Sequence, residues 1–326
     1  MHVFMDESGS FSGFTHGSLG VVAALAVPDT TLPKLTARYL NVRSDLPQKH
    51  GEVKGKSLNE TQVSNIITLL TRYHVILEVT VIDLGAHTLE GVVAYKNNLA
   101  QLMEDRLPRF NSSAQIEVCR TIDQIRKTSV PLFLQAMASF DVLQSVIRHV
   151  PLFFAQRQPR ELNNFSWVVD GKGPSKVTDW ESWWSWYAHG ALAVRSRTYP
   201  RPELIGADYS YFTRFDARDG EGTDLELLLA DLRFSSDIEP GLELVDILVN
   251  ATRRALVGNL RIEGWRNIRR LMIHRPEHYI NLMLLAGAGQ APTRPVYGAV
   301  VKHFSAHGKT MLSPKFSRMA AEEEAA

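Results

Sequence analysis

The residues that decide the fold are HVFMDESG at positions 2–9 and LGVVAALAV at positions 19–27. The first run is apolar up to Met5 and turns acidic at Asp6 and Glu7, which predicts a short strand that ends in a Ser-Gly turn. The second run is rich in Val and Ala and does not alternate with polar residues, which is typical of a strand buried on both faces. The chain therefore begins with the centre of a sheet.

Composition sets limits on the class of protein. The chain has 326 residues, of which 44% are hydrophobic and 22% charged, as in ordinary globular proteins, and its net charge of +1 indicates no partner by itself. The only cysteine, Cys119, excludes an intramolecular disulfide and a cysteine-based metal centre. The N-terminus has no basic region, and the apolar run at Leu19–Pro28 is too short to cross a membrane. We therefore expect a cytoplasmic protein without a membrane partner.

The rest of the chain alternates between strand-like and helix-like segments. Strands are predicted at Val75–Ile82, which is followed by Asp83, at Phe165–Val169, which leads into Asp170, and at the edge segment Leu232–Phe234. One helix is predicted after Ser57, which would cap it with Glu60 as the capping-box partner, and another over Leu242–Leu256. This alternation predicts an α/β fold. We expect one domain over residues 1–312, with a helical insertion over about 88–162 and a disordered tail over 313–326.

Four acidic residues occupy positions where a sheet would bring them together. Asp6 and Asp170 follow strands, and ligands bind at the carboxyl ends of strands in open α/β sheets. Glu52 lies in a turn, and Asp246 lies in an apolar helix, where a carboxylate needs a partner. A metal ion shared with the other acids would be such a partner; the alternative is a surface stripe on which Asp246 pairs with Arg253 or Arg254.

Carboxylates that converge on one point repel each other and stay ionised only with a cation among them. Hard oxygen ligands favour Mg²⁺ or Mn²⁺, which can activate water and stabilise charge on a phosphate. The acids therefore predict a divalent-metal site.

Four segments, taken in order, resemble a known family of bacterial proteins. They are MDESG at 5–9, GEVKG at 51–55, WVVD at 167–170, and Ser235-Ser236 followed by GLELVD at 241–246. This pattern is similar to that of the domain of unknown function 3800, whose members look like ribonuclease-H-type domains. The resemblance implies a mixed sheet flanked by helices and an acidic metal site for phosphodiester chemistry, with Asp6, Glu52, Asp170 and Asp246 as metal ligands and catalytic residues.

The sequence departs from that family pattern at two positions. Glu243 stands where the family usually has Gln, and Asp237 stands where a Lys is common after the paired serines. Both changes add negative charge near the predicted site, and they leave open whether one or two metals bind. Asp83, at the end of another predicted strand, is an alternative to Asp170 as the mid-sheet ligand.

A basic segment follows the apolar helix. Seven arginines and one acid lie between positions 253 and 275, and Arg266, Arg269 and Arg270 are predicted to share a helical face beside Trp265. Such a face can bind phosphate backbones while the aromatic ring stacks on a base. The candidate nucleic-acid contacts are Lys54, Arg253, Arg254, Arg266, Arg269 and Arg270. The alternative is a solvated face that pairs with acids elsewhere.

Two functions remain from these observations. The first is a Mg²⁺- or Mn²⁺-dependent nuclease that hydrolyses DNA or RNA. The second is a catalytically inactive ribonuclease-H-like scaffold that binds nucleic acid or a protein. A third class, a sugar hydrolase with two carboxylates, leaves the arginines and the remaining acids unexplained. The sequence does not decide between DNA and RNA, endo and exo action, or a monomer and a homo-oligomer.

Overall fold

The computed structural model describes residues 1–109, 112–171, 178–184, 204–217, 222–275, 279–285 and 297–324. Its centre is a mixed six-stranded sheet with the order β7-β6-β1-β2-β5-β8. The strands are β1 (His2–Ser8), β2 (Leu19–Val27), β5 (Ile76–Asp83), β6 (Ser166–Asp170), β7 (Leu232–Ser235) and β8 (Ile280–Met283). β2 runs antiparallel to β1 and β5, and the other neighbouring strands are parallel. A separate hairpin joins β3 (Gln48–Lys49) to β4 (Glu52–Val53).

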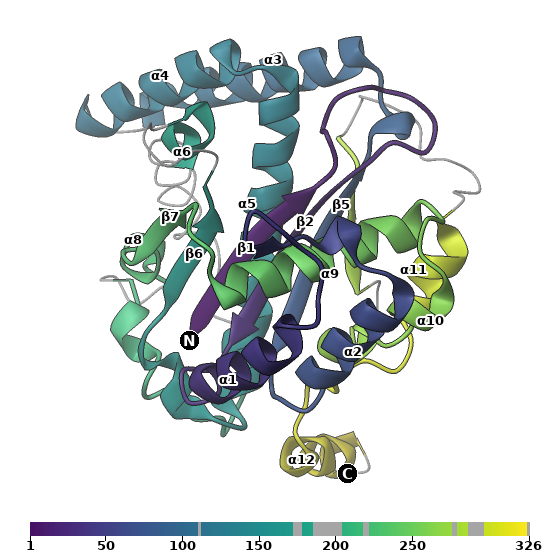
Figure 1. The fold of residues 1–326 in the computed structure, drawn as a ribbon. Helices are drawn as coiled ribbons and strands as arrows, with labels where there is room; N and C mark the ends of the chain where they lie inside the picture. Colours follow the sequence, from purple (N-terminus) through teal and green to yellow (C-terminus); the bar gives the residue numbers. More distant parts are fainter. Residues whose placement is uncertain are drawn as a thin grey trace.

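Helices cover both faces of this sheet (Figure 1). They are α1 (Leu32–Arg43), α2 (Glu60–Leu70), α3 (Leu89–Asp105), α4 (Ser112–Lys127), α5 (Val130–Ala155), α6 (Asp179–Trp183), α8 (Leu225–Leu228), α9 (Pro240–Leu256), α10 (Ile262–Trp265), α11 (Gly298–Phe304) and α12 (Pro314–Glu324). Short 3₁₀ turns include η1 (Gly55–Ser57), η2 (Leu84–Ala86) and η7 (Ile268–Leu271). The α/β class predicted from the sequence is confirmed.

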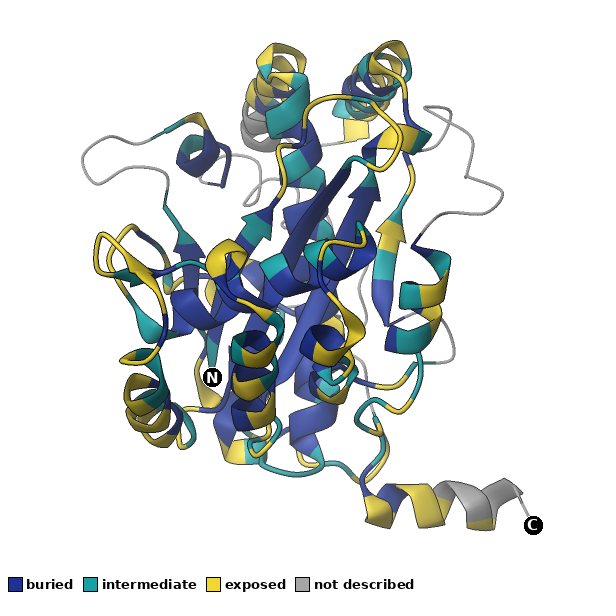
Figure 2. Ribbon diagram, turned by 45° about the vertical axis from the view of Figure 1, so that its right-hand side comes forward, coloured by how far each residue is buried: buried dark blue, intermediate teal, exposed yellow. Residues whose placement is uncertain are grey.

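The alternation of side chains along β1 divides the core into two layers. Val3 and Met5 pack with α5 on one face, whereas Phe4 packs with α1, α2 and α9 on the other. All nine residues of β2 are buried, as predicted for a central strand (Figure 2). Gly241 lets α9 lie close against β1, because a Cβ at this position would come within 2.3 Å of the Phe4 ring. The position of α9 over β1 is thus set by close packing.

Helix α5 is a long apolar helix of 26 residues. Within the described residues it is the one helix that is long and apolar enough to cross a membrane, and 56% of its most apolar window is buried inside the protein. Its Phe140, Leu143 and Val146 belong to the core beneath the sheet. Its composition is therefore that of a core helix.

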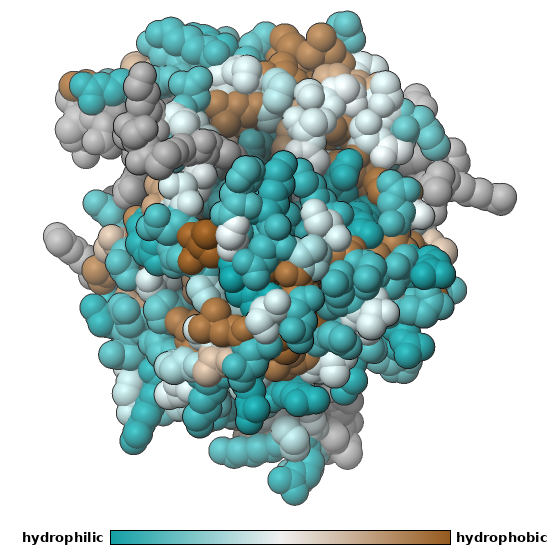
Figure 3. All heavy atoms as spheres, in the orientation of Figure 1, coloured by the Kyte–Doolittle hydropathy of each residue, from teal (hydrophilic) through white to brown (hydrophobic). Residues whose placement is uncertain are grey.

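The segment between β5 and β6 is helical, as predicted, and it divides into two parts. α5 lies on the sheet, whereas α3 and α4 pack against each other at one end of the molecule (Figure 1). In the space-filling view the α9 face is largely hydrophilic, and apolar side chains gather toward the α3–α4 end (Figure 3). The exposed apolar residues Leu102 and Ile116 belong to that pair of helices.

The tail is a correction to the sequence prediction. Residues 313–326 were predicted to be disordered, but Pro314–Glu324 forms helix α12, with Phe316 5% exposed. Most of its residues are Glu, Ala, Met, Lys or Arg, which are strong helix formers, and Pro314 stands at its first position. Its acidic composition was therefore a poor indicator of disorder.

Candidate acidic site

The sheet and α9 bring three of the predicted acids together. β1 and β6 pair in parallel with Met5 opposite Val169, so that Asp6 and Asp170 are neighbours on adjacent strands. Phe4 and Val168, which lie two residues before Asp6 and Asp170 on the same strands, belong to the core layer on the α9 side. Because side chains alternate along a strand, Asp6 and Asp170 lie on the same side, where α9 contributes Asp246.

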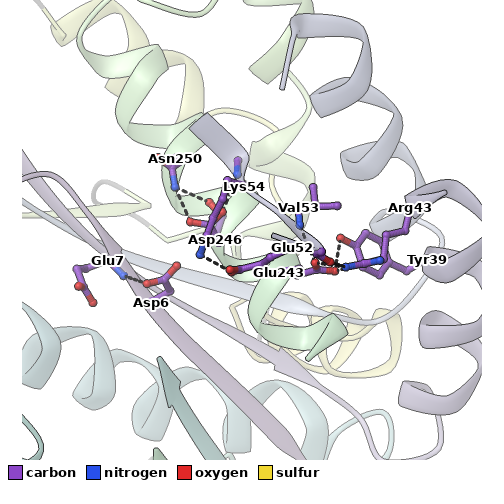
Figure 4. Close-up of polar contacts among 12 residues, drawn as sticks. Asp6, Glu7, Tyr39, Arg43, Glu52, Val53, Lys54, Glu243, Asp246 and Asn250 are labelled. Carbon is purple, nitrogen blue, oxygen red and sulfur yellow. Dashed lines mark hydrogen bonds and ion pairs between the residues drawn. The ribbon is translucent and has the colours of Figure 1, made fainter. Parts of the chain in front are cut away.

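Hydrogen bonds hold Asp6 and Asp246 in place (Figure 4). Asp6 is 8% exposed, and its Oδ1 accepts a hydrogen bond from the Glu7 N–H at 2.7 Å. Asp246 Oδ2 accepts from the Gly55 N–H at 2.6 Å, and its Oδ1 accepts from Asn250 Nδ2 at 2.8 Å. Ser8 Oγ donates to Asn250 Oδ1 at 3.0 Å, which ties the end of β1 to α9. Each carboxyl group thus accepts from a backbone N–H, and the Asn250 amide joins Asp246 to Ser8 at the end of β1.

The electrostatic environment of these acids is strongly negative. Burial raises the pKa of Asp6 well above its ordinary value, and the charges of Glu7, Asp170 and Asp246 raise it further. Burial also raises the pKa of Asp246, although the Gly55 N–H and the Lys54 ammonium oppose that rise. Asp6 and Asp246 are also hydrogen-bond neighbours. A group of buried acids that repel each other in this way is stabilised by a proton or a cation.

Glu52 and Lys54 reach this place from the β3–β4 hairpin and the turn that follows it. The Lys54 ammonium forms an ion pair with the Glu52 carboxylate, and its charge also acts on Asp246 and Asp170. Figure 4 shows the Lys54 side chain beside Asp246, with its ammonium at Glu52. Lys54 is therefore the positive charge that the structure places among the acids.

Gly55 sets how closely this turn approaches α9. A Cβ at position 55 would lie 2.6 Å from the Ile247 Cα and 2.7 Å from the Asp246 carbonyl oxygen. Only a residue without a side chain brings its N–H to the Asp246 carboxylate at this separation. Arg254 Nη1 donates to the carbonyls of Gly55 at 3.3 Å and Leu58 at 2.7 Å, which holds the same turn from outside.

Glu243 lies on α9 with its charge fully paired, so its contribution to the site differs from the prediction. Its side chain is 1% exposed and accepts hydrogen bonds from Arg43 Nε at 2.6 Å and Arg43 Nη2 at 2.7 Å. It also accepts from Tyr39 Oη at 3.0 Å and from the Val53 N–H at 2.7 Å. Glu243 thus holds β4 on α9 through Val53, the residue between Glu52 and Lys54. The sequence did not show this role, because Arg43 and Tyr39 lie 200 and 204 residues away from Glu243.

Asp83 lies apart from the other acids. Asp6 pairs with Ala23, and Ala23 pairs with Val79, so Asp83 lies four residues further along β5, or roughly 13 Å. Its Oδ1 accepts from the Gly85 N–H at 2.9 Å, and its Oδ2 accepts from Tyr297 Oη at 2.8 Å. Of the two alternatives, Asp170 is the one whose charge acts on Asp6.

The arginines after Asp246 do not form one face, which corrects the prediction. α10 ends at Trp265, and Arg269 and Arg270 lie in the separate turn η7. Trp265 is 6% exposed and donates its Nε1–H to the Leu260 carbonyl at 3.0 Å, so it does not offer a stacking surface. Arg253 Nε donates to the Leu19 carbonyl at 3.1 Å, and Arg266 and Arg270 are exposed. A helical period predicted this face, but the helix stops after one turn.

The chemistry of the acidic site suits Mg²⁺ or Mn²⁺, because its donors are carboxylate oxygens. Across the described ranges, however, no group of three or more His, Cys, Asp or Glu residues is arranged so that it could hold a metal ion. The Lys54 ammonium pairs with Glu52 in this arrangement. A metal ion among these acids would replace Lys54 as the counter-charge of Glu52.

Comparisons with protein-family models, curated proteins and solved structures found no match to this chain.

Proposed function

We propose that the protein is a divalent-metal-dependent nuclease with a ribonuclease-H-like fold, which hydrolyses phosphodiester bonds of DNA or RNA. The observation that carries the proposal is the placement of Asp6, Asp170 and Asp246 on one side of the sheet beneath α9. The mixed sheet, with β2 reversed and helices on both faces, supports the same class of fold. The resemblance of four ordered segments to the domain of unknown function 3800 supports it independently.

The roles of the residues follow from their positions. Asp6, Glu52, Asp170 and Asp246 would hold Mg²⁺ or Mn²⁺, which would supply a nucleophilic water and stabilise charge on the phosphate. Asn250 and the Gly55 N–H keep Asp246 oriented, and Glu243 keeps the β4 segment against α9. Lys54 lies close enough to this site to contact a phosphate oxygen of the substrate. The exposed Arg266 and Arg270 remain candidates for contacts with more distant backbone phosphates.

A second candidate is an inactive ribonuclease-H-like scaffold that binds nucleic acid or a protein. The observation in its favour is that Lys54 pairs with Glu52, so that the acids have a positive partner without a metal. In a scaffold, these interactions would serve to hold the β3–β4 hairpin on α9. The two candidates differ in whether a metal ion binds among the acids.

A metal titration followed by thermal unfolding tests the site. We expect Mn²⁺ and Mg²⁺ to raise the melting temperature of the wild type, because a ligand that binds only the folded state adds about 2.7 kcal/mol at a hundred times its Kd. Asp6→Asn and Asp246→Asn should abolish that rise, whereas Asp83→Asn, outside the site, should keep it. If both site variants keep the full rise, the ions bind elsewhere and the metal site is refuted.

A further inference from the structure

A second group of charged residues lies at the other end of the sheet. It consists of four basic side chains, called here the basic cluster: His74, Arg157, Arg270 and Lys309. They come from the residues before β5, the end of α5, the turn η7 and the segment before α12. His74 lies five residues before Val79, the β5 residue level with Asp6, and on the side away from Asp83. The basic cluster is therefore distinct from the acidic site.

Backbone contacts bring these four segments together. Lys309 N–H donates to the Met272 carbonyl at 2.8 Å, and its own carbonyl accepts from the His274 N–H at 2.6 Å, just after Arg270 in η7. Lys309 Nζ lies 3.4 Å from the carbonyl of Tyr73, next to His74. Arg157 Nη2 donates to the Thr310 carbonyl at 2.8 Å, and its Nη1 donates to the Met311 carbonyl at 2.9 Å. Lys309 is thus the centre on which the other three converge.

The basic cluster has no negative partner within the described residues. None of its four side chains forms an ion pair with a carboxylate there. Burial and, to a smaller extent, the charges of Arg157 and Arg270 lower the pKa of Lys309 to about 8. The pKa of His74 is lowered by burial and then by Lys309 and Arg157. The charges in the cluster therefore repel each other, as the acids do at the other end.

Several hydrogen-bond donors of the basic cluster remain available. Both Nη atoms of Arg157 donate to backbone carbonyls, so Arg157 holds the segment before α12 and contributes its charge to the cluster. Lys309 uses one of its three N–H donors, for the long contact to Tyr73. The exposed Arg270 and His74 make no side-chain hydrogen bond to another described residue. Donors from three separate segments can therefore meet a single small ligand.

We propose that the basic cluster is an oxyanion site that binds a phosphate group, with Lys309 and Arg270 donating to its oxygens, His74 at its edge and Arg157 supplying charge from behind. A tetrahedral dianion accepts hydrogen bonds from several directions and neutralises the charges that otherwise repel each other. This site does not depend on the proposed nuclease activity. It stays intact if the acidic site binds no metal.

Sulfate is the sharpest probe, because it remains a dianion throughout the neutral and alkaline range. We expect sulfate, added at constant ionic strength against chloride, to raise the melting temperature of the full chain along a saturating curve. Calorimetric titration should give a Kd that Lys309→Met and Arg270→Gln each weaken by about tenfold or more. Lys302→Met, which removes an exposed lysine of α11 outside the cluster, should bind sulfate like the wild type.

The unliganded variants give an independent reading. Without sulfate, Lys309→Met should melt at or above the temperature of the wild type, because it removes a charge that Arg157 and Arg270 repel. Arg270→Gln changes an exposed residue, so it keeps the test valid if Lys309→Met fails to fold. Inorganic phosphate and glycerol phosphate should both displace sulfate, and the tighter of the two identifies a free or an esterified phosphate as the better ligand.

The pH dependence follows from the groups that face Lys309. Guanidinium groups stay protonated in alkaline solution, so Lys309, with a pKa of about 8, is the group of the cluster that loses its charge there. Sulfate affinity should therefore fall as the pH rises above 8, until it reaches the affinity of Lys309→Met, and this dependence should vanish in that variant. The proposal is overturned by a melting temperature that does not saturate with sulfate, by unchanged binding in both cluster variants, or by an equal loss in Lys302→Met.

Discussion

Asp170→Ala is expected to stop cleavage of nucleic acid while most of the binding remains. Asp170 is beside Asp6 on the neighbouring strand, and its charge acts on both Asp6 and Lys54. If the protein is the proposed nuclease, loss of this ligand removes several kcal/mol of transition-state stabilisation, which corresponds to a rate reduction of about 100-fold or more. The measurement is cleavage of a mixed panel of DNA and RNA substrates with Mn²⁺, with a chelator as the blank.

Asp83→Ala is the matched control for that experiment. It removes an acid from the end of another strand of the same sheet, but one held by Tyr297 and the Gly85 N–H, roughly 13 Å further along. We expect it to keep clear activity. If Asp83→Ala is inactive and Asp170→Ala is active, the catalytic acids lie at the end of β5. A wild type that binds but cuts no substrate with either metal favours the inactive scaffold.

Glu243→Ala is expected to cause a large loss of stability, because it removes a buried acceptor on α9. Glu243 is 1% exposed and Arg43 is 17% exposed. Truncation of the acid leaves the Tyr39 hydroxyl and the Val53 N–H without their acceptor, and it leaves the Arg43 guanidinium with the Gly51 carbonyl but no carboxylate. Removal of one partner from a buried ion pair typically costs about 3–5 kcal/mol. Denaturant unfolding should show this as a lower midpoint with an unchanged slope.

Glu239→Gln is the control for the Glu243 variants, because it tests an ion pair at the start of the same helix. Glu239 pairs with Arg233, whose side chain is 49% exposed, and we expect the variant to cost less than about 1 kcal/mol. Glu243→Gln restores the residue usual in the resembled family. It can still accept from the Val53 N–H but leaves Arg43 without a carboxylate, so its cost should fall between those of the other two. If Glu239→Gln and Glu243→Ala lower the free energy of unfolding equally, Glu243 does not hold β4 on α9 as described.

The sequence predicted those features that depend on local pattern. The unbroken apolar run of β2, the strands that end near Asp83 and Asp170, and the apolar helix with Asp246 are all present. It was less accurate where several local signals compete. Helix α2 begins after Asn59, with a capping box to Gln62, rather than after Ser57. The helical face predicted for Arg266, Arg269 and Arg270 does not form, because α10 is only four residues long.

By itself, therefore, the sequence determined which residues are buried in strands and helices, because the period of apolar residues records burial along one element. It also marked Asp6, Asp170 and Asp246 as acids in unusual positions. Only the tertiary structure decided that Asp170 rather than Asp83 lies beside Asp6, that Arg43 pairs with Glu243, and that three other basic side chains meet around Lys309. These facts depend on strand order and on contacts between segments as far as 236 residues apart, which no local pattern encodes.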